Sequence, residues 1–113
     1  MIQARSLDLE TLPLPSPVGS ILRDYGTISS TVIHTMENKG FLSGKAMVPD
    51  NCNGGSAYLQ INGIFVGGIP YCGTGVNNLQ VGFSVPVNVG TQIRFGVSNG
   101  GKFEAVKLVT SNW

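Results

Sequence analysis

Turn-forming residues interrupt this chain at short, regular intervals, and this spacing limits the folds that it can adopt. Clusters of Gly, Asn and Pro recur about every 8–12 residues from Ile21 onward, which is too often for long helices. The segments between the clusters are rich in β-branched and aromatic residues, which favour strands, and none repeats its apolar residues at the helical period. We therefore predict an all-β fold: an antiparallel β-sandwich over residues 21–113.

Apolar residues at alternate positions mark the individual strands. Residues 79–85 and 91–98 alternate in this way, and residues 27–34 and 41–48 are rich in residues that suit a pleated surface. Residues 102–109 are expected to return from the Asn99-Gly100-Gly101 turn and to pair with residues 91–98. A two-residue loop and a three-residue loop would place Phe103 on different faces, so the register of this pair stays open.

The strongest local signal is a hairpin expected over residues 56–66. Asn62-Gly63 is the preferred pair for a two-residue type I′ turn, because both central residues need a positive φ. Such a turn places two aliphatic pairs on one face of the ribbon: Ile61 opposite Ile64, and Leu59 opposite Val66. The other face then carries Tyr58, Gln60 and Phe65. Four aliphatic residues on one side support this register.

Residues 1–20 have a different character from the rest of the chain. Three prolines alternate with other residues there, at Pro13, Pro15 and Pro17. They remove N–H donors that a helix or a central strand would need, so an extended backbone is favoured. We predict an N-terminal arm or linker over residues 1–20, with leucines that dock onto another chain, followed by the sandwich domain over residues 21–113.

Charge and hydropathy exclude several classes of protein. Seven Lys and Arg residues against six Asp and Glu residues give a net charge of +1, which is a poor basis for binding nucleic-acid phosphates. No apolar run approaches the roughly 20 residues of a membrane span, and no basic segment precedes an apolar one as in a secretory signal. Charged residues are only 12% of the chain, so we expect apolar surface to be buried between the subunits of a homo-oligomer.

The residues that catalysis or metal binding would need are sparse. His34 is the only histidine, and we interpret it as a structural residue. The four acids that might act in pairs are spread singly over different turns and strands, at Asp24, Glu37, Asp50 and Glu104. Residues 67–75 are rich in glycine but lack the G-K-[ST] ending of a phosphate-binding loop. We predict no enzymatic activity, no cofactor and no metal site.

Two cysteines, Cys52 and Cys72, lie in separate loops rich in Gly and Asn. They are compatible with a disulfide that joins the two loops or with two free thiols. Without a secretion signal the compartment is undecided, and we favour the thiols.

Three segments resemble a known family when they are taken in order: GFL at 40–42, SAYLQING at 56–63 and VPVNVGTQI at 85–93. This succession is similar to the C-terminal β-sandwich (knob) domains of bacteriophage tail fibres and related virion appendage proteins, and it covers residues 27–113. The resemblance implies a trimeric, non-enzymatic, jelly-roll-like knob in the virion, made in the host cytoplasm. It also implies an arm that attaches to other virion proteins and loops that bind a receptor on the host surface.

The receptor, a glycan or a protein, is expected to bind at one end of the sandwich. Two loops, 50–55 and 67–78, flank the central hairpin opposite the Asn62-Gly63 turn, so they should lie close together, with Cys52 and Cys72 within bridging distance. The candidate binding residues are Asn51, Asn53, Tyr71, Asn77 and Asn78. The alternative is a structural virion protein, a capsid decoration or tail adaptor, with no external ligand. A small polysaccharide-degrading enzyme is a third hypothesis.

Overall fold

The computed structural model describes residues 19–49, 52–73, 75 and 79–112. This described part of the chain contains eight strands and no helix: β1 (Ile21–Ile28), β2 (Val32–Thr35), β3 (Gly40–Met47), β4 (Ser56–Ile61), β5 (Ile64–Ile69), β6 (Gln80–Val87), β7 (Gln92–Ser98) and β8 (Lys102–Val109). No helix in these residues is long and apolar enough to cross a membrane. The arm predicted over residues 1–20 lies outside the described residues except for Gly19 and Ser20.

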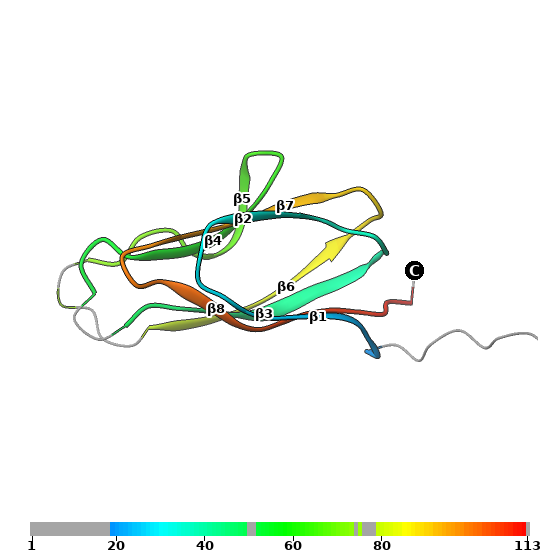
Figure 1. Cartoon of the computed structure of the whole chain (residues 1–113), viewed down its shortest axis with the longest axis horizontal. Coiled ribbons are helices and arrows are strands. Elements are labelled where there is room, and N and C mark those ends of the chain that lie inside the picture. The colour runs from blue at the N-terminus through cyan, green and yellow to red at the C-terminus, as the bar shows by residue number, and fades with distance from the viewer. Residues whose placement is uncertain (1–18, 50–51, 74, 76–78, 113) are drawn as a thin grey trace, which may run out of the picture.

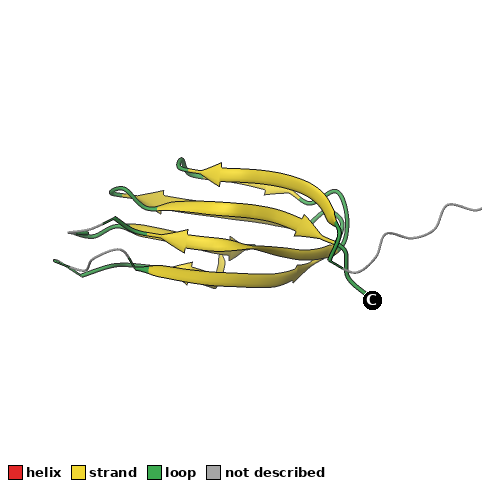
Figure 2. Cartoon of the chain, turned by 90° about the horizontal axis from the view of Figure 1, so that it is seen from below, coloured by secondary structure: helices red, strands yellow, loops and turns green. Residues whose placement is uncertain are grey.

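The eight strands form two antiparallel sheets that pack face to face (Figures 1 and 2). Sheet A has the strand order β1-β8-β3-β6, and sheet B has the order β2-β7-β4-β5. Every connection except β4–β5 crosses from one sheet to the other, which is the strand order of a double-sheet jelly roll. The predicted fold class is therefore confirmed.

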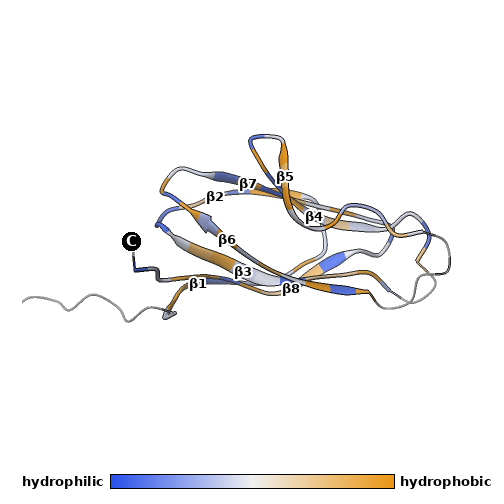
Figure 3. Ribbon diagram, turned by 180° about the vertical axis from the view of Figure 1, so that it is seen from behind, coloured by the Kyte–Doolittle hydropathy of each residue, from blue (hydrophilic) through white to orange (hydrophobic). Residues whose placement is uncertain are grey.

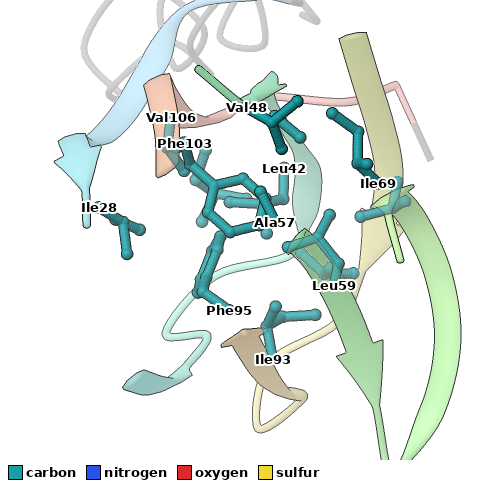
Figure 4. Packing of buried hydrophobic residues seen from close by; sticks show 14 of the residues in the cluster. Ile28, Leu42, Val48, Ala57, Leu59, Ile69, Ile93, Phe95, Phe103 and Val106 are labelled. Carbon is teal, nitrogen blue, oxygen red and sulfur yellow. The ribbon is translucent and has the colours of Figure 1, made fainter. Parts of the chain in front are cut away.

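The core fills the space between the two sheets (Figure 4). Phe95 on β7 and Phe103 on β8 are both fully buried, and their rings meet edge to face with centroids 5.2 Å apart. Because these residues belong to different sheets, this contact joins the two layers at the centre of the sandwich. A positive φ of 56° at Ala105 accompanies a bulge in the pairing of β8 with β3. The bulge lets Phe103 and Val106 both face inward despite their odd spacing.

Two strand predictions were wrong because they ignored the partner sheet. Residues 27–34 do not form one strand: β1 ends at Ile28 in sheet A, residues 29–31 cross the sandwich, and β2 begins at Val32 in sheet B. Residues 91–98 and 102–109 do not pair as a hairpin either. Their three-residue turn changes sheets, so β8 pairs with β1 and β3 instead. β-Branched residues favour an extended backbone, but they do not determine which strand it pairs with or which sheet it joins.

The β4–β5 hairpin confirms the predicted turn and corrects its register. Asn62 and Gly63 have φ values of 53° and 79°, as a type I′ turn requires. Ile61 lies opposite Ile64 as predicted, but a bulge places Leu59 opposite Gly67 rather than Val66. Figure 1 shows the tip of this hairpin rising away from the sandwich. The side chain of Ile64 is consequently 67% exposed, because no strand of sheet A lies beneath it.

The two ends of the sandwich differ in what they carry (Figure 2). One end, called here the loop end, holds residues 29–31, 52–55, 70–73 and 99–101. The other, called the terminal end, holds the β2–β3 and β6–β7 turns together with Gly19, Ser20 and residues 110–112, while the β4–β5 turn rises from the sandwich between the two ends (Figure 1). Backbone hydrogen bonds from Gly19 N to Thr110 O (3.2 Å) and from Thr110 N to Ser20 O (2.9 Å) hold the two ends of the described chain side by side.

Candidate functional site

A disulfide joins two of the loops at the loop end. Cys52 and Cys72 are bonded, with their Cα atoms 6.3 Å apart, and both are buried. Our preference for two free thiols was therefore wrong, whereas the expectation that these loops lie together is confirmed. Three backbone hydrogen bonds reinforce the link: Gly54 N to Cys72 O (3.1 Å), Cys72 N to Gly55 O (2.9 Å) and Gly75 N to Cys52 O (3.0 Å).

The β7–β8 turn is tied to the same body by polar contacts. The hydroxyls of Ser56 and Ser98 lie 2.7 Å apart, and Asn99 Nδ2 donates to the Asn53 carbonyl over 3.1 Å. Gly101 packs so closely that a Cβ atom there would overlap the Ser56 carbonyl. Three loops that are distant in sequence are thus held as one unit, because the loop at residues 52–55 is bonded both to the loop that carries Cys72 and to the β7–β8 turn.

A cavity lined by hydroxyl groups lies beside this unit. It has a volume of about 370 Å³ and is open to solvent, and its polar lining includes Ser29, Ser30, Thr31, Ser98, Asn99 and Lys102. Thr31 holds one wall of the cavity in place. Its hydroxyl accepts a hydrogen bond from Val97 N (3.1 Å) and donates one to Val97 O (3.3 Å). Hydroxyl and amide groups both donate and accept hydrogen bonds, which suits a ligand that is itself rich in hydroxyl groups.

The predicted site residues are only partly within the described chain. Tyr71 is 67% exposed, and Asn53 is also exposed. Both lie at the loop end, where a Cβ atom on the intervening Gly54 would be 3.7 Å from the Tyr71 ring. Asn51, Asn77 and Asn78 lie outside the described residues. The sequence therefore located one part of this end through its loop composition.

The cavity residues were missed because their sequence signal is ordinary. Residues 29–31 fell within a predicted strand, and residues 99–101 were interpreted only as a tight turn. The Ser29-Ser30 pair, which interrupts a run of β-branched residues, is the signal that could have shown the crossing. Nothing in the local sequence, however, shows that this crossing lies against the β7–β8 turn.

The charged groups near the cavity largely neutralise one another. Lys102 Nζ lies 3.1 Å from Glu104 Oε2, and Lys45 Nζ lies 3.9 Å from Glu104 Oε1. Among the described residues, no three His, Cys, Asp or Glu side chains gather as a metal site would require. The loop end therefore offers a ligand hydrogen bonds and one aromatic surface rather than a strong electrostatic field.

His34 is half-buried on β2, as a structural histidine would be. Its ring lies 4.8 Å from that of Tyr25 and 5.7 Å from that of Phe95, measured between centroids. Burial lowers the pKa of His34, and the nearby Arg23 guanidinium lowers it further. The same cluster raises the pKa of Tyr25, mainly through burial.

Comparisons with known proteins add little to this description. No protein-family model matches the chain, and no curated protein matches it. One solved structure that matches is a family 35 carbohydrate-binding module from an environmental isolate. The two chains are 13% identical, and the match covers 86% of this chain and 90% of the other, with a TM-score of 0.37. At this level of similarity the match carries no inference about function, and the resemblance to phage tail-fibre domains stays a prediction.

Proposed function

We propose that this chain is a non-catalytic receptor-binding domain of a phage virion appendage, and that it binds a host-surface glycan at its loop end. The main support for this proposal is that the loop end is built as one ordered unit. The Cys52–Cys72 disulfide and the Ser56–Ser98 contact hold three separate loops as one body beside a hydroxyl-lined cavity. A site that is already ordered loses less conformational entropy when a ligand binds.

The chemistry at the loop end suits a sugar. The exposed ring of Tyr71 offers an apolar face on which a pyranose can stack. The hydroxyls of Ser29 and Ser30, with the amide of Asn99, supply donors and acceptors for sugar hydroxyls. Together they provide an apolar surface and a hydrogen-bonding wall on one rigid end of the molecule.

The position of the chain ends supports display from a larger assembly. Gly19 and Ser20 lie beside Thr110 at the terminal end, opposite the loops. An arm over residues 1–20 that binds other virion proteins would hold the domain with its loops directed outward. Two large apolar side chains are exposed, Ile64 at the start of β5 and Val89 in the β6–β7 turn. A homotrimer whose contacts include these two side chains would cover them.

Each of the described acids is engaged by another group of the chain, which supports a binding role rather than a catalytic one. Asp24 accepts a hydrogen bond from Gly26 N (2.9 Å), and Glu37 lies 3.8 Å from Arg23. Glu104 lies between two lysines. None of these three carboxylates lines the cavity.

The test is binding of the full chain to an array of bacterial lipopolysaccharide and capsule oligosaccharides, together with competition against phage adsorption to host cells. Tyr71→Ala should weaken binding about two- to tenfold, because an aromatic contact contributes about 0.5–1.5 kcal/mol. Tyr71→Phe is the matched control and should retain binding, since it keeps the ring. If the chain binds no glycan and does not compete with adsorption, the proposal is wrong and a structural virion protein becomes the better assignment.

A further inference from the structure

The outer face of sheet B has a distinctive composition. Its four strands, β2, β7, β4 and β5, contain a single charged residue, Arg94. In the pairing of these strands Ile33 lies opposite Arg94, Arg94 opposite Gln60, and Gln60 opposite Phe65. These four residues form one row across the sheet. They point outward, because their neighbours Leu59, Ile93 and Phe95 are buried in the core.

The row borders a hollow toward the terminal end of the sheet. The hollow has a volume of about 270 Å³, and its lining includes the side chains of Ile33, Gln60, Asn62, Gln92 and Arg94. Three amides thus surround one guanidinium group, and each amide can both donate and accept hydrogen bonds. Figure 3 shows the hydrophilic colour on β7 and the hydrophobic colour on β5, two strands of this same sheet.

The guanidinium of Arg94 has no partner within the described part of the chain. Arg23, by contrast, lies near Glu37 and over the Tyr25 ring. The described acids Asp24, Glu37 and Glu104 belong to sheet A or to the β2–β3 turn, and each is engaged there. Arg94 is therefore an exposed cation without a described counter-ion, placed among neutral hydrogen-bonding groups.

Aromatic and aliphatic surface flanks the hollow. Phe65, 47% exposed, ends the row on one side, and Ile33, 55% exposed, ends it on the other. In the next row Tyr58 lies flat over Gly96, where a Cβ atom would be only 2.7 Å from Tyr58 Oη. Gly96 thereby leaves room for the tyrosine ring on the sheet surface.

We infer that this face is a second carbohydrate site, separate from the loop end, and that it takes an acidic sugar such as a uronic or sialic acid. Arg94 would bind the carboxylate through its planar fork of N–H groups. Gln60 and Gln92 would bind the neighbouring hydroxyls, and Phe65 would contact the ring face of an adjacent sugar. A neutral sugar would use the same amides but would leave the guanidinium unpaired, so acidic sugars should be preferred.

The experiment is isothermal titration calorimetry of the full chain with sialyllactose and trigalacturonate, with lactose and maltotriose as neutral counterparts. The acidic sugars should bind and the neutral ones should bind much more weakly. Arg94→Gln should weaken binding of the acidic sugars about tenfold or more, because a hydrogen bond to a charged group contributes more than a neutral one. Arg94→Lys should restore only part of the affinity, since an ammonium group lacks the planar fork.

Lys39→Gln is the matched control. It removes the same charge from an exposed turn outside the hollow and should change affinity by less than about twofold, because Lys39 does not line the hollow and the effect of an exposed charge on a ligand there is screened by salt. Equal losses of affinity for the acidic sugars in Arg94→Gln and Lys39→Gln would show only a general electrostatic attraction to a positive protein. That result would overturn the proposed site. Binding without preference for acidic sugars would overturn it as well.

Two further results distinguish a sugar site at Arg94 from the loop-end site and from a contact between two copies of the chain. Tyr71→Ala should leave binding of acidic sugars unchanged, so failure of the loop-end site and failure of this one give different results. If Arg94→Gln changes the mass of the protein measured by light scattering and no acidic sugar binds, this face contacts a carboxylate of a second copy instead, and the inference is wrong.

Discussion

Reduction of the Cys52–Cys72 disulfide is expected to lower the free energy of unfolding by about 3 kcal/mol. The two cysteines are separated by 20 positions, and closing a loop of that length removes entropy of about 11 cal/mol/K from the unfolded chain. At 25 °C this corresponds to about 3 kcal/mol. For a domain of this size, the midpoint of thermal unfolding should fall by about 10–15 °C.

Urea denaturation with and without reductant measures this effect. Both sulfurs are buried, so reduction, which keeps their volume, is a cleaner change than substitution. The double variant Cys52→Ala with Cys72→Ala should unfold at the same urea concentration in either condition, which controls for other effects of the reductant. A loss below about 1 kcal/mol in the wild type would show that the loops are held by their hydrogen bonds alone.

Reduction should also separate the two proposed sites. The loop-end site depends on loops that the disulfide joins, so glycan binding there should weaken. Binding of acidic sugars at Arg94 should persist while the protein stays folded, because Arg94 is held by the pairing of β7 with β2 and β4, and neither cysteine lies in these strands. Equal losses at both sites in protein that is shown to be folded would contradict this division.

Two further predictions concern local features. Gly63→Val should cost about 1–2 kcal/mol of unfolding free energy, because a β-branched residue resists the positive φ of 79° there. Gly82→Val, at an exposed strand position without positive φ and with open space, should cost much less. A difference in unfolding free energy below about 0.5 kcal/mol between the two variants in urea denaturation would show that valine is not strained at position 63. The lowered pKa of His34 means that the unfolded chain takes up the proton first, so stability should decrease as pH falls below about 6.5. This decrease should be smaller in His34→Gln, and identical pH profiles for the two proteins would contradict it.

Local chemistry accounts for the features that sequence reasoning predicted correctly. The Asn62-Gly63 turn depends on the φ preferences of two residues, and these hold in any surroundings. The strands predicted at 41–48, 79–85, 91–98 and 102–109 lie near the observed bounds of β3, β6, β7 and β8. This agreement arises because alternation of apolar residues and the placement of turn residues involve only a few neighbouring positions. Part of the loop end was predicted for the same reason, since Asn53 and Tyr71 lie in loops rich in glycine.

What the sequence by itself determined was where the backbone extends and where it turns; the tertiary structure decided which strands meet and which faces are covered. The turn at residues 99–101 fits a hairpin locally, yet β7 and β8 lie in different sheets. Ile64 has the character of a core residue, yet it is exposed because its hairpin extends past the opposite sheet. Arg94 gains its amide neighbours, and residues 29–31 meet the β7–β8 turn, only through pairing across long sequence distances. The physical reason is that φ preferences and side-chain alternation act between adjacent residues, whereas burial and strand pairing depend on segments that only the folded chain brings together.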